Sequence, residues 1–263
     1  MVVEELDPYI ERELKIIANE KNLKIKIIGK ELLPQIGELN MELIENAIAK
    51  ILGLKIKKLN NLFKTGNLKL EISRRTPKLC EGCPYWYALP TIKRMAPEGT
   101  IFGGDIGCNM MTGLAPHNMQ DYLFCMGASI GIGHGVSKAT SGKQKVITIM
   151  GDGTFFHSGM AGLVNAVYNQ SSPLMIILDN RITAMTGHQQ NPGMGKNGML
   201  QDSPELNIEE IVKSLGVKNV KTLDQGNTKE LEATMTEFLA KSDISVIICK
   251  RICAILDRRQ KNQ

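Results

Sequence analysis

Two polar residues, Asp152 and Asn180, have the side-chain types and the spacing of a magnesium site. Asp152 lies in a Gly-Asp-Gly-Thr segment directly after a strand-sized apolar run, and Asn180 comes soon after the next such run. If a helix connects the two runs, they form parallel strands, and both residues emerge at the carboxyl edge of one sheet, where open α/β sheets bind ligands. Carboxylate and amide oxygens suit Mg²⁺, which usually keeps phosphate and water ligands as well. Gly151 and Gly153 allow close backbone approach and the next helix N-terminus favours an anion, so the pattern predicts a Mg²⁺–diphosphate site.

Other phosphate-binding motifs are absent or weak. The chain contains no Gly-x-x-x-x-Gly-Lys-Ser/Thr segment, which excludes a P-loop. The glycines at 131, 133 and 135 lack the spacing of the dinucleotide fingerprint and follow no clear strand, which argues against a Rossmann NAD site. A lone Gly-Asp-Gly is most often an ordinary turn, so the prediction depends on the elements that flank it.

Those flanking elements belong to an alternating pattern that runs from residue 80 to 256. Apolar runs predict strands at 145–150, 174–178, 217–223 and 244–249, and helical spacing predicts helices at 154–169, at 208–215 and around 231–239. Continuous Val, Ile and Leu runs between helices indicate a mostly parallel sheet with helices on both faces. We therefore predict an α/β fold, with 80–256 as one complete domain.

The first 79 residues follow a different pattern. We expect 1–52 to contain a helix with Asp7 as its N-cap and Pro8 at its first position, a short strand at 24–29, and a helix at 41–52 that ends at Gly53. This is too little for a stable domain alone, and we interpret it as the tail of a preceding α/β domain. Residues 53–79 look like a linker with one possible strand at 68–72, and 257–263 like a tail.

Length and composition bound the remaining possibilities. A chain of 263 residues, 43% hydrophobic and 22% charged, is globular and holds one or two domains. No apolar run approaches the ~20 residues of a membrane span, and no signal peptide is visible, so we expect a cytoplasmic protein with no membrane contact. The net charge of +5 comes from the flanks and aromatic residues are only 5%, so no nucleic-acid partner is expected.

The six cysteines form no complete metal-site pattern along the chain. Cys80 and Cys83 make a Cys-x-x-Cys pair, but a zinc ribbon needs a second pair and an iron–sulfur domain needs a dense run of four. We favour structural or loop cysteines, and keep a ligand-contacting thiol and a metal site as alternatives.

Five segments together carry a resemblance to a known family: 80–84 (Cys-Glu-Gly-Cys-Pro), 104–108 (Gly-Asp-Ile-Gly-Cys), 125–131, 151–159 and 178–189. They resemble the thiamine diphosphate-binding part of the indolepyruvate:ferredoxin oxidoreductase alpha subunit, in the 2-oxoacid:ferredoxin oxidoreductase superfamily. The resemblance covers roughly 1–256. It implies the thiamine diphosphate-binding fold, thiamine diphosphate and Mg²⁺ as cofactors, and oxidative decarboxylation of an aryl 2-oxo acid, such as indolepyruvate, to an acyl-coenzyme A.

The resemblance also implies a role for each matching residue. The side chains of Asp152 and Asn180 and the carbonyl of Ile182 would bind Mg²⁺, while Gly151, Gly153 and Thr154 would hold the diphosphate. Ile130 matches the bulky apolar residue that bends the cofactor, Ala128 and Ile130 would offer backbone groups to its aminopyrimidine, and Ser129 between them would also be a cofactor-binding residue. Cys83, Gly104, Asp105, Ile106, Gly107 and Cys108 would line the thiazolium side, and His188 would face the substrate as the catalytic residue.

Three departures from the family shape the functional expectation. Tyr85 stands where the family has histidine after Cys-x-Gly-Cys-Pro. The family's ferredoxin-like four-cysteine clusters are missing, so iron–sulfur clusters are expected only in partner chains or a missing domain. The glutamate that contacts the aminopyrimidine would come from a separate pyrimidine-binding domain.

We therefore expect activity only with partners: a chain or domain with that glutamate, a beta-type subunit, and an iron–sulfur or ferredoxin partner. Two alternatives stay open. One is a non-catalytic thiamine diphosphate-binding or assembly subunit. The other is a Mg²⁺-dependent phosphohydrolase that uses Asp152, which the segment 128–131 argues against.

Overall fold

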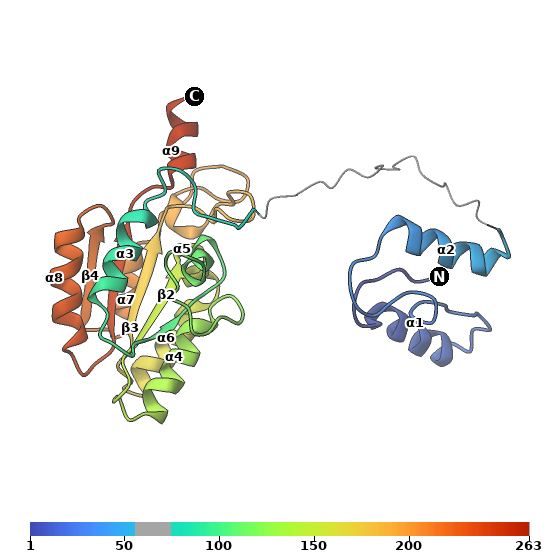
Figure 1. Cartoon of the computed structure of the whole chain (residues 1–263), viewed down its shortest axis with the longest axis horizontal. Coiled ribbons are helices and arrows are strands. Elements are labelled where there is room, and N and C mark those ends of the chain that lie inside the picture. The colour runs from blue at the N-terminus through green and yellow to red at the C-terminus, as the bar shows by residue number, and fades with distance from the viewer. Residues whose placement is uncertain (56–74, 263) are drawn as a thin grey trace, which may run out of the picture. The chain divides into compact units, whose positions relative to one another are not determined.

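The structure, a computed structural model, describes residues 1–55 and 75–262. The chain divides into two compact units, Met1–Ser73 and Arg74–Gln263, both drawn in Figure 1. The possible strand at 68–72 lies outside the described residues. Within the described parts, no helix is long and apolar enough to cross a membrane.

The second unit is built on a five-stranded sheet in which every neighbouring pair is parallel. Its strands are β1 (Ile101–Gly103), β2 (Val146–Gly151), β3 (Leu174–Asp179), β4 (Asn219–Asp224) and β5 (Ser245–Lys250), in the spatial order β1-β2-β3-β5-β4. The predicted parallel α/β fold is confirmed. Only β1 was not expected, because three residues are too few to produce a periodic pattern.

Helices cover both faces of this sheet. Side chains alternate between the faces, so that Ile149 packs in one apolar core and Met150 in the other. The first core includes residues of α3 (Tyr85–Met95) and α8 (Thr228–Leu239), and the second includes residues of α4 (Ala128–Ala139), α6 (Met160–Tyr168) and α7 (Ile208–Ser214). Figure 1 shows α3 beside α8 and α4 beside α6. Both faces of the sheet are therefore covered by helices, and a ligand site can form among the loops at its carboxyl edge.

The segment that follows β2 is helical from its first residue. Helix α5 (Asp152–Thr154) continues through a π-helical turn (Phe155–Gly159) into α6, whereas the sequence pattern predicts a plain helix from 154. The π turn inserts extra backbone into the helix, a feature that concentrates at functional sites. Asp152 is thus the first residue of a long helix rather than part of a turn.

Two 3₁₀ turns and one more helix surround the carboxyl edge. The turns are Cys108–Gly113, after β1, and Pro192–Met194, after β3. Helix α9 (Ala254–Lys261) includes most of the segment interpreted as a tail, and it follows β5 directly. These segments supply several of the residues that line the cavities described below.

The first unit contains two helices, α1 (Tyr9–Glu20) and α2 (Met41–Leu52). The predicted capping of α1 is wrong: Pro8 is the N-cap, and the carboxylate of Glu4 accepts the N–H groups of Ile10 and Glu11 at 2.8 and 2.9 Å. Helix α2 has its predicted bounds, with Gly53 in the left-handed conformation at its end.

The strand predicted at 24–29 does not form. Its alternating Lys and Ile residues suit a strand, but a strand needs a neighbour with which to pair. Within the described residues of this segment, the only contact of that kind is one hydrogen bond from the Val2 N–H to the Ile28 carbonyl, at 2.7 Å.

Candidate functional site

A cavity of about 180 Å³ lies at the carboxyl edge of the sheet. Its walls come from the loop after β1, the start of the helix after β2, and the loop after β3. The predicted site residues among them are Ile106, Gly107, Cys108, Gly151, Asp152, Gly153, Thr154, Asn180 and Ile182. The structure therefore brings together the residues expected to bind the metal and the diphosphate, although they are spread over 77 positions (106 to 182, counted inclusively).

Asp152 is the buried acid of this cavity. Burial, reinforced by the negative charge of Asp179, raises the pKa of Asp152 to about 7. A hydrogen bond from Asn191 Nδ2 to Asp152 Oδ2, at 2.8 Å, acts in the opposite direction. The pKa of Asp179 is also raised by burial, although the N–H and charge of Arg181 favour its carboxylate form. Two buried acids side by side are expensive to ionise without a counter-charge, so the environment fits a bound divalent cation.

Asn180 is fixed at the same edge by its own backbone. Its Oδ1 accepts a hydrogen bond from the Ile182 N–H at 3.2 Å, and Arg181, between them, has a positive φ of 64°. A carbonyl oxygen has two lone pairs, so Asn180 Oδ1 keeps capacity for a cation. Carboxylate, amide and backbone carbonyl oxygens are the donor set that Mg²⁺ takes, and the residues present fit this ion.

The start of the helix after β2 fits an anion. No side chain caps its N-terminus at Gly151, so its first N–H groups are available to a ligand on the cavity side. The Thr154 hydroxyl donates to the Ile106 carbonyl at 3.1 Å and ties the helix to the loop after β1. A Cβ on Gly153 would overlap the Thr183 hydroxyl, so only glycine lets the loop after β3 pack on this helix start.

Asp105 holds the loop after β1 in place. Its carboxylate is fully buried and accepts hydrogen bonds from the N–H groups of Ile106 at 2.8 Å, Gly127 at 2.9 Å and Ser129 at 3.2 Å. It joins the loop after β1 to the N-terminus of α4 and does not line the cavity, and neither does Gly104. Asp105 therefore positions the segments around the cavity, and the place of Asp105 and Gly104 on the thiazolium side stays a prediction.

Ile130 does not face the cavity either. It is fully buried in the core beneath α4, where it fills the space left by Gly162 of α6. Helix α4 begins at Ala128, and Ser129 and Ala128 are likewise absent from the cavity wall. These three residues do not line this cavity, and their contact with the aminopyrimidine stays a prediction.

Met126 contributes a bulky apolar side chain to the cavity wall, as do Ile106, Ile182 and Met185. Met126 precedes Gly127, whose positive φ of 87° ends the loop and starts α4. The hydroxyl of Ser158, in the π turn, donates to the Met126 carbonyl at 2.7 Å and fixes this residue. Sequence reasoning missed Met126, although a glycine before a helix indicates that the preceding residue is the last one in the loop.

A second cavity of about 360 Å³ adjoins the first and shares Cys108, Asn180, Ala184 and Met185 with it. Its walls carry Cys80, Cys83, Cys108, Cys253 and His188. Burial raises the pKa of Cys83 to about 12 and that of Cys108 to about 11. His188 Nε2 lies 3.9 Å from Cys253 Sγ, and burial lowers the pKa of His188. Cys83 and His188 thus line this second cavity, together with Cys80 of the Cys-x-x-Cys pair and with Cys253, which was not among the predicted site residues.

Tyr85 also lines the first cavity. Its ring is fully buried, and its hydroxyl donates to the Leu178 carbonyl at 3.3 Å. Burial raises its pKa well above the ordinary tyrosine value. At this position the chain presents a neutral phenol that bonds to the sheet.

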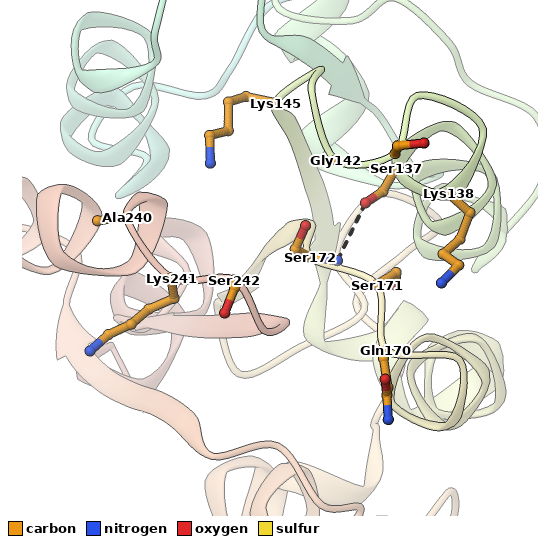
Figure 2. A pocket seen from close by; sticks show the side chains of 11 residues that line it. Ser137, Lys138, Gly142, Lys145, Gln170, Ser171, Ser172, Ala240, Lys241 and Ser242 are labelled. Carbon is orange, nitrogen blue, oxygen red and sulfur yellow. Dashed lines mark hydrogen bonds between the residues drawn. The ribbon is translucent and has the colours of Figure 1, made fainter.

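A further cavity, of about 610 Å³, lies at the opposite edge of the sheet, among the loops that lead into β2, β3 and β5 (Figure 2). Its lysines already have partners: Lys138 donates to the Asn169 carbonyl and Lys145 to the Leu239 carbonyl, both at 2.9 Å. Both carbonyls lie at helix C-termini, which favour a cation. The positions of Lys138 and Lys145 are therefore explained by their hydrogen bonds to helix C-termini, without a ligand in this cavity.

Comparison with known proteins identifies a family and several relatives of this chain. The family described as "Thiamine pyrophosphate enzyme, C-terminal TPP binding domain" matches residues 105–249. The chain is 36% identical to the indolepyruvate oxidoreductase subunit IorA of Thermococcus kodakarensis and 37% identical to that of Methanothermobacter thermautotrophicus. Each alignment covers 97% of this chain and 41% of the relative, so the chain spans about two-fifths of these relatives.

A solved structure supports the fold. The 2-oxoglutarate:ferredoxin oxidoreductase from Magnetococcus marinus superposes with a TM-score of 0.60 at 18% identity, covering 69% of this chain and 66% of that one. At this identity the likeness concerns the fold alone.

Proposed function

Because the chain belongs to the thiamine pyrophosphate enzyme family through the C-terminal TPP-binding domain, we propose that it anchors thiamine diphosphate through Mg²⁺ within a 2-oxoacid:ferredoxin oxidoreductase. The observation that carries the proposal is the single cavity that holds Asp152 and Asn180 against an uncapped helix N-terminus. A P-loop or dinucleotide site would place a glycine-rich loop there without this acid–amide pair.

In this proposal each wall residue has a defined task. Asp152, Asn180 and the Ile182 carbonyl hold Mg²⁺, and the helix start at Gly151–Thr154 holds the diphosphate through its N–H groups. Met126 supports the middle of the cofactor in the place first assigned to Ile130. When bound, thiamine diphosphate supplies the electron sink for decarboxylation, while the protein binds, orients and shields it from water.

Substrate and partners follow from the relatives' names and from the resemblance of the sequence motifs, and they are part of the proposal. The relatives are named as subunits of indolepyruvate oxidoreductases, so we assign an aryl 2-oxo acid as substrate. Coenzyme A as acyl acceptor and ferredoxin as electron acceptor are carried over from the resemblance of the sequence motifs to the indolepyruvate:ferredoxin oxidoreductase family. A beta-type subunit or another domain would supply the glutamate for the aminopyrimidine. The six unpaired cysteines are consistent with the reducing cytoplasm as its location.

The cysteines of the second cavity raise the question of whether this chain itself holds an iron–sulfur cluster. Four of the six cysteines, Cys80, Cys83, Cys108 and Cys253, line one largely apolar cavity that adjoins the cofactor cavity. Within the described residues no group of three or more His, Cys, Asp or Glu side chains is placed to hold a metal ion, and burial raises the pKa of Cys83 and Cys108 so that both stay neutral thiols. We therefore keep the proposal that the iron–sulfur clusters belong to partner chains or a missing domain, and that these cysteines form an apolar wall beside the cofactor.

Titration calorimetry of the chain with its assembled partners tests the main proposal. We expect thiamine diphosphate to bind only with Mg²⁺, and Asp152→Ala to abolish binding. Asp202→Ala is the matched control, because Asp202 is exposed and pairs only with Lys196. Absence of Mg²⁺-dependent binding in the wild-type assembly would contradict the proposal. Decarboxylation assays with and without partners then distinguish an enzyme from a non-catalytic binding subunit.

A further inference from the structure

Asn191 bridges the metal-binding acid and the loop after β3. The residue is buried; its Oδ1 accepts a hydrogen bond from the Gly193 N–H at 3.0 Å, and its Nδ2 donates to Asp152 Oδ2 at 2.8 Å. The sequence patterns did not single it out, and 39 positions separate it from Asp152.

The orientation of this amide is fixed by its surroundings. Asn191 is the N-cap of the turn Pro192–Met194, so its oxygen must face the Gly193 N–H. Gly193 itself packs against the ring of Phe156, where a Cβ would come within 3.0 Å of Cε2. With the oxygen committed to the turn, the NH₂ group can only point at Asp152.

This contact limits how Asp152 can bind a cation. Oδ2 already accepts the Asn191 N–H group, so a cation meets less competition at Oδ1, and binding through both oxygens would require the Asn191 contact to weaken. A carboxylate that offers one oxygen suits Mg²⁺, which requires near-octahedral geometry with short bonds. Ca²⁺ takes more ligands and accepts both oxygens of one carboxylate.

We propose that Asn191 is a positioning residue that holds Asp152 to one metal-binding oxygen and so makes the site select Mg²⁺ over Ca²⁺. The inference rests on the proposed function, because it presumes that a divalent cation binds with thiamine diphosphate. A role limited to capping the turn would affect both cations equally.

The chain offers a matched control in Asn227. Its Oδ1 accepts the Glu230 N–H at 3.3 Å and its Nδ2 donates to Glu230 Oε2 at 2.9 Å, at the exposed start of α8. Asn227 thus has the same pair of contacts, a helix cap and a carboxylate, outside both cavities.

The test compares Asn191→Ser, Asn191→Thr and Asn227→Ser with wild type in the assembled protein. Serine and threonine both keep a capping oxygen but lose the NH₂ donor, and neither adds a charge beside Asp152. Calorimetry measures thiamine diphosphate binding at a series of Mg²⁺ or Ca²⁺ concentrations. We expect both Asn191 variants to lose about 10- to 100-fold in Mg²⁺ affinity and to lose far less in Ca²⁺ affinity. Asn227→Ser should match wild type.

Each outcome decides the question. Equal losses for the two cations, or an unchanged Mg²⁺ preference in both Asn191 variants, would overturn the inference. If one variant fails to fold, as judged by its melting temperature, the other decides. If the wild-type protein binds thiamine diphosphate with neither cation, the proposed function fails. If the wild-type protein binds it and the Asn191 variants keep the same preference for Mg²⁺, only the inference about Asn191 fails.

Discussion

The carboxylate of Asp105 accepts a hydrogen bond from the Gly127 N–H at 2.9 Å, and this contact joins the loop after β1 to the residue that follows Met126. Two further N–H groups share the same carboxylate. Asp105→Ala would leave three buried donors unpaired, so we expect a loss of about 3–5 kcal/mol in the free energy of unfolding. Denaturant titration measures it. Asp121→Ala, which removes one exposed hydrogen bond to the Phe102 N–H, should cost about 1 kcal/mol, and equal costs would contradict the role of Asp105.

Substitution of Met126 is expected to change thiamine diphosphate affinity, and substitution of Ile130 is expected to change the free energy of unfolding. Met126→Ala removes a cavity-wall side chain, so it should weaken thiamine diphosphate binding by about tenfold with little effect on unfolding. Ile130→Ala removes a fully buried core side chain, so it should cost about 2–5 kcal/mol of stability while the folded fraction keeps its affinity. Calorimetric titration and denaturant unfolding of both variants measure the two effects. The reverse assignment would restore Ile130 as the cofactor-facing residue.

The raised pKa of Asp152 predicts a pH dependence. A carboxyl with a pKa of about 7 must lose its proton before it binds a cation, so the affinity for Mg²⁺–thiamine diphosphate should rise as pH increases through about 7, with proton release. Calorimetry in buffers of different ionisation enthalpy counts the released protons. Binding that is independent of pH and releases no proton between pH 6 and 8 would show that Asp152 does not ligate the metal.

The same pKa affects stability with the opposite sign. Without ligand, folded Asp152 holds its proton more tightly than the unfolded chain does. Its contribution to stability is therefore present below the ordinary aspartate pKa and is lost as pH rises towards about 7. We expect Asp152→Asn to flatten this part of the profile of unfolding free energy against pH. A profile unchanged by the substitution would contradict the raised pKa.

Gly153 is expected to tolerate no side chain. In Gly153→Ala the new Cβ overlaps the Thr183 hydroxyl and displaces the loop that carries Asn180, so thiamine diphosphate affinity should fall at least about tenfold. Thr183→Ala removes the overlapping oxygen, and the double variant should recover part of the affinity. Equal affinities for the single and the double variant would mean that the overlap is not the cause.

The sheet and the grouping of Asp152 with Asn180 were predictable from sequence because both depend on local patterns. Buried parallel strands are continuous apolar runs, and the topology places both strand ends at one edge, which brings Asp152 and Asn180 together. The alternating pattern at 24–29 predicted a strand that does not form, because a strand must pair with a neighbouring strand and the local pattern does not show whether one is present.

The residues that sequence analysis did not place at the site are brought there by contacts between segments far apart in the chain. Which of Met126 and Ile130 faces the cavity depends on where α4 begins, and a shift of a few residues exchanges core and cavity. Cys80 and Cys253 line the same cavity although 173 positions separate them in the sequence. Cys253 lies in a loop after β5 that has no periodic pattern. Asn191 lies in an irregular segment, where only the folded backbone shows that its amide reaches Asp152.

The most direct test of the account replaces Mg²⁺ with Mn²⁺ and records the magnetic coupling between the metal and the phosphorus nuclei of thiamine diphosphate in the assembled protein. Mn²⁺ takes the same oxygen ligands, and its unpaired electrons report on directly bound phosphates. The account predicts strong phosphorus coupling in wild type, its loss in Asp152→Ala, and its retention in Asp202→Ala. Coupling that persists in Asp152→Ala, or that is absent from a wild-type protein with both ligands bound, would contradict the claim that this cavity holds the metal–diphosphate group.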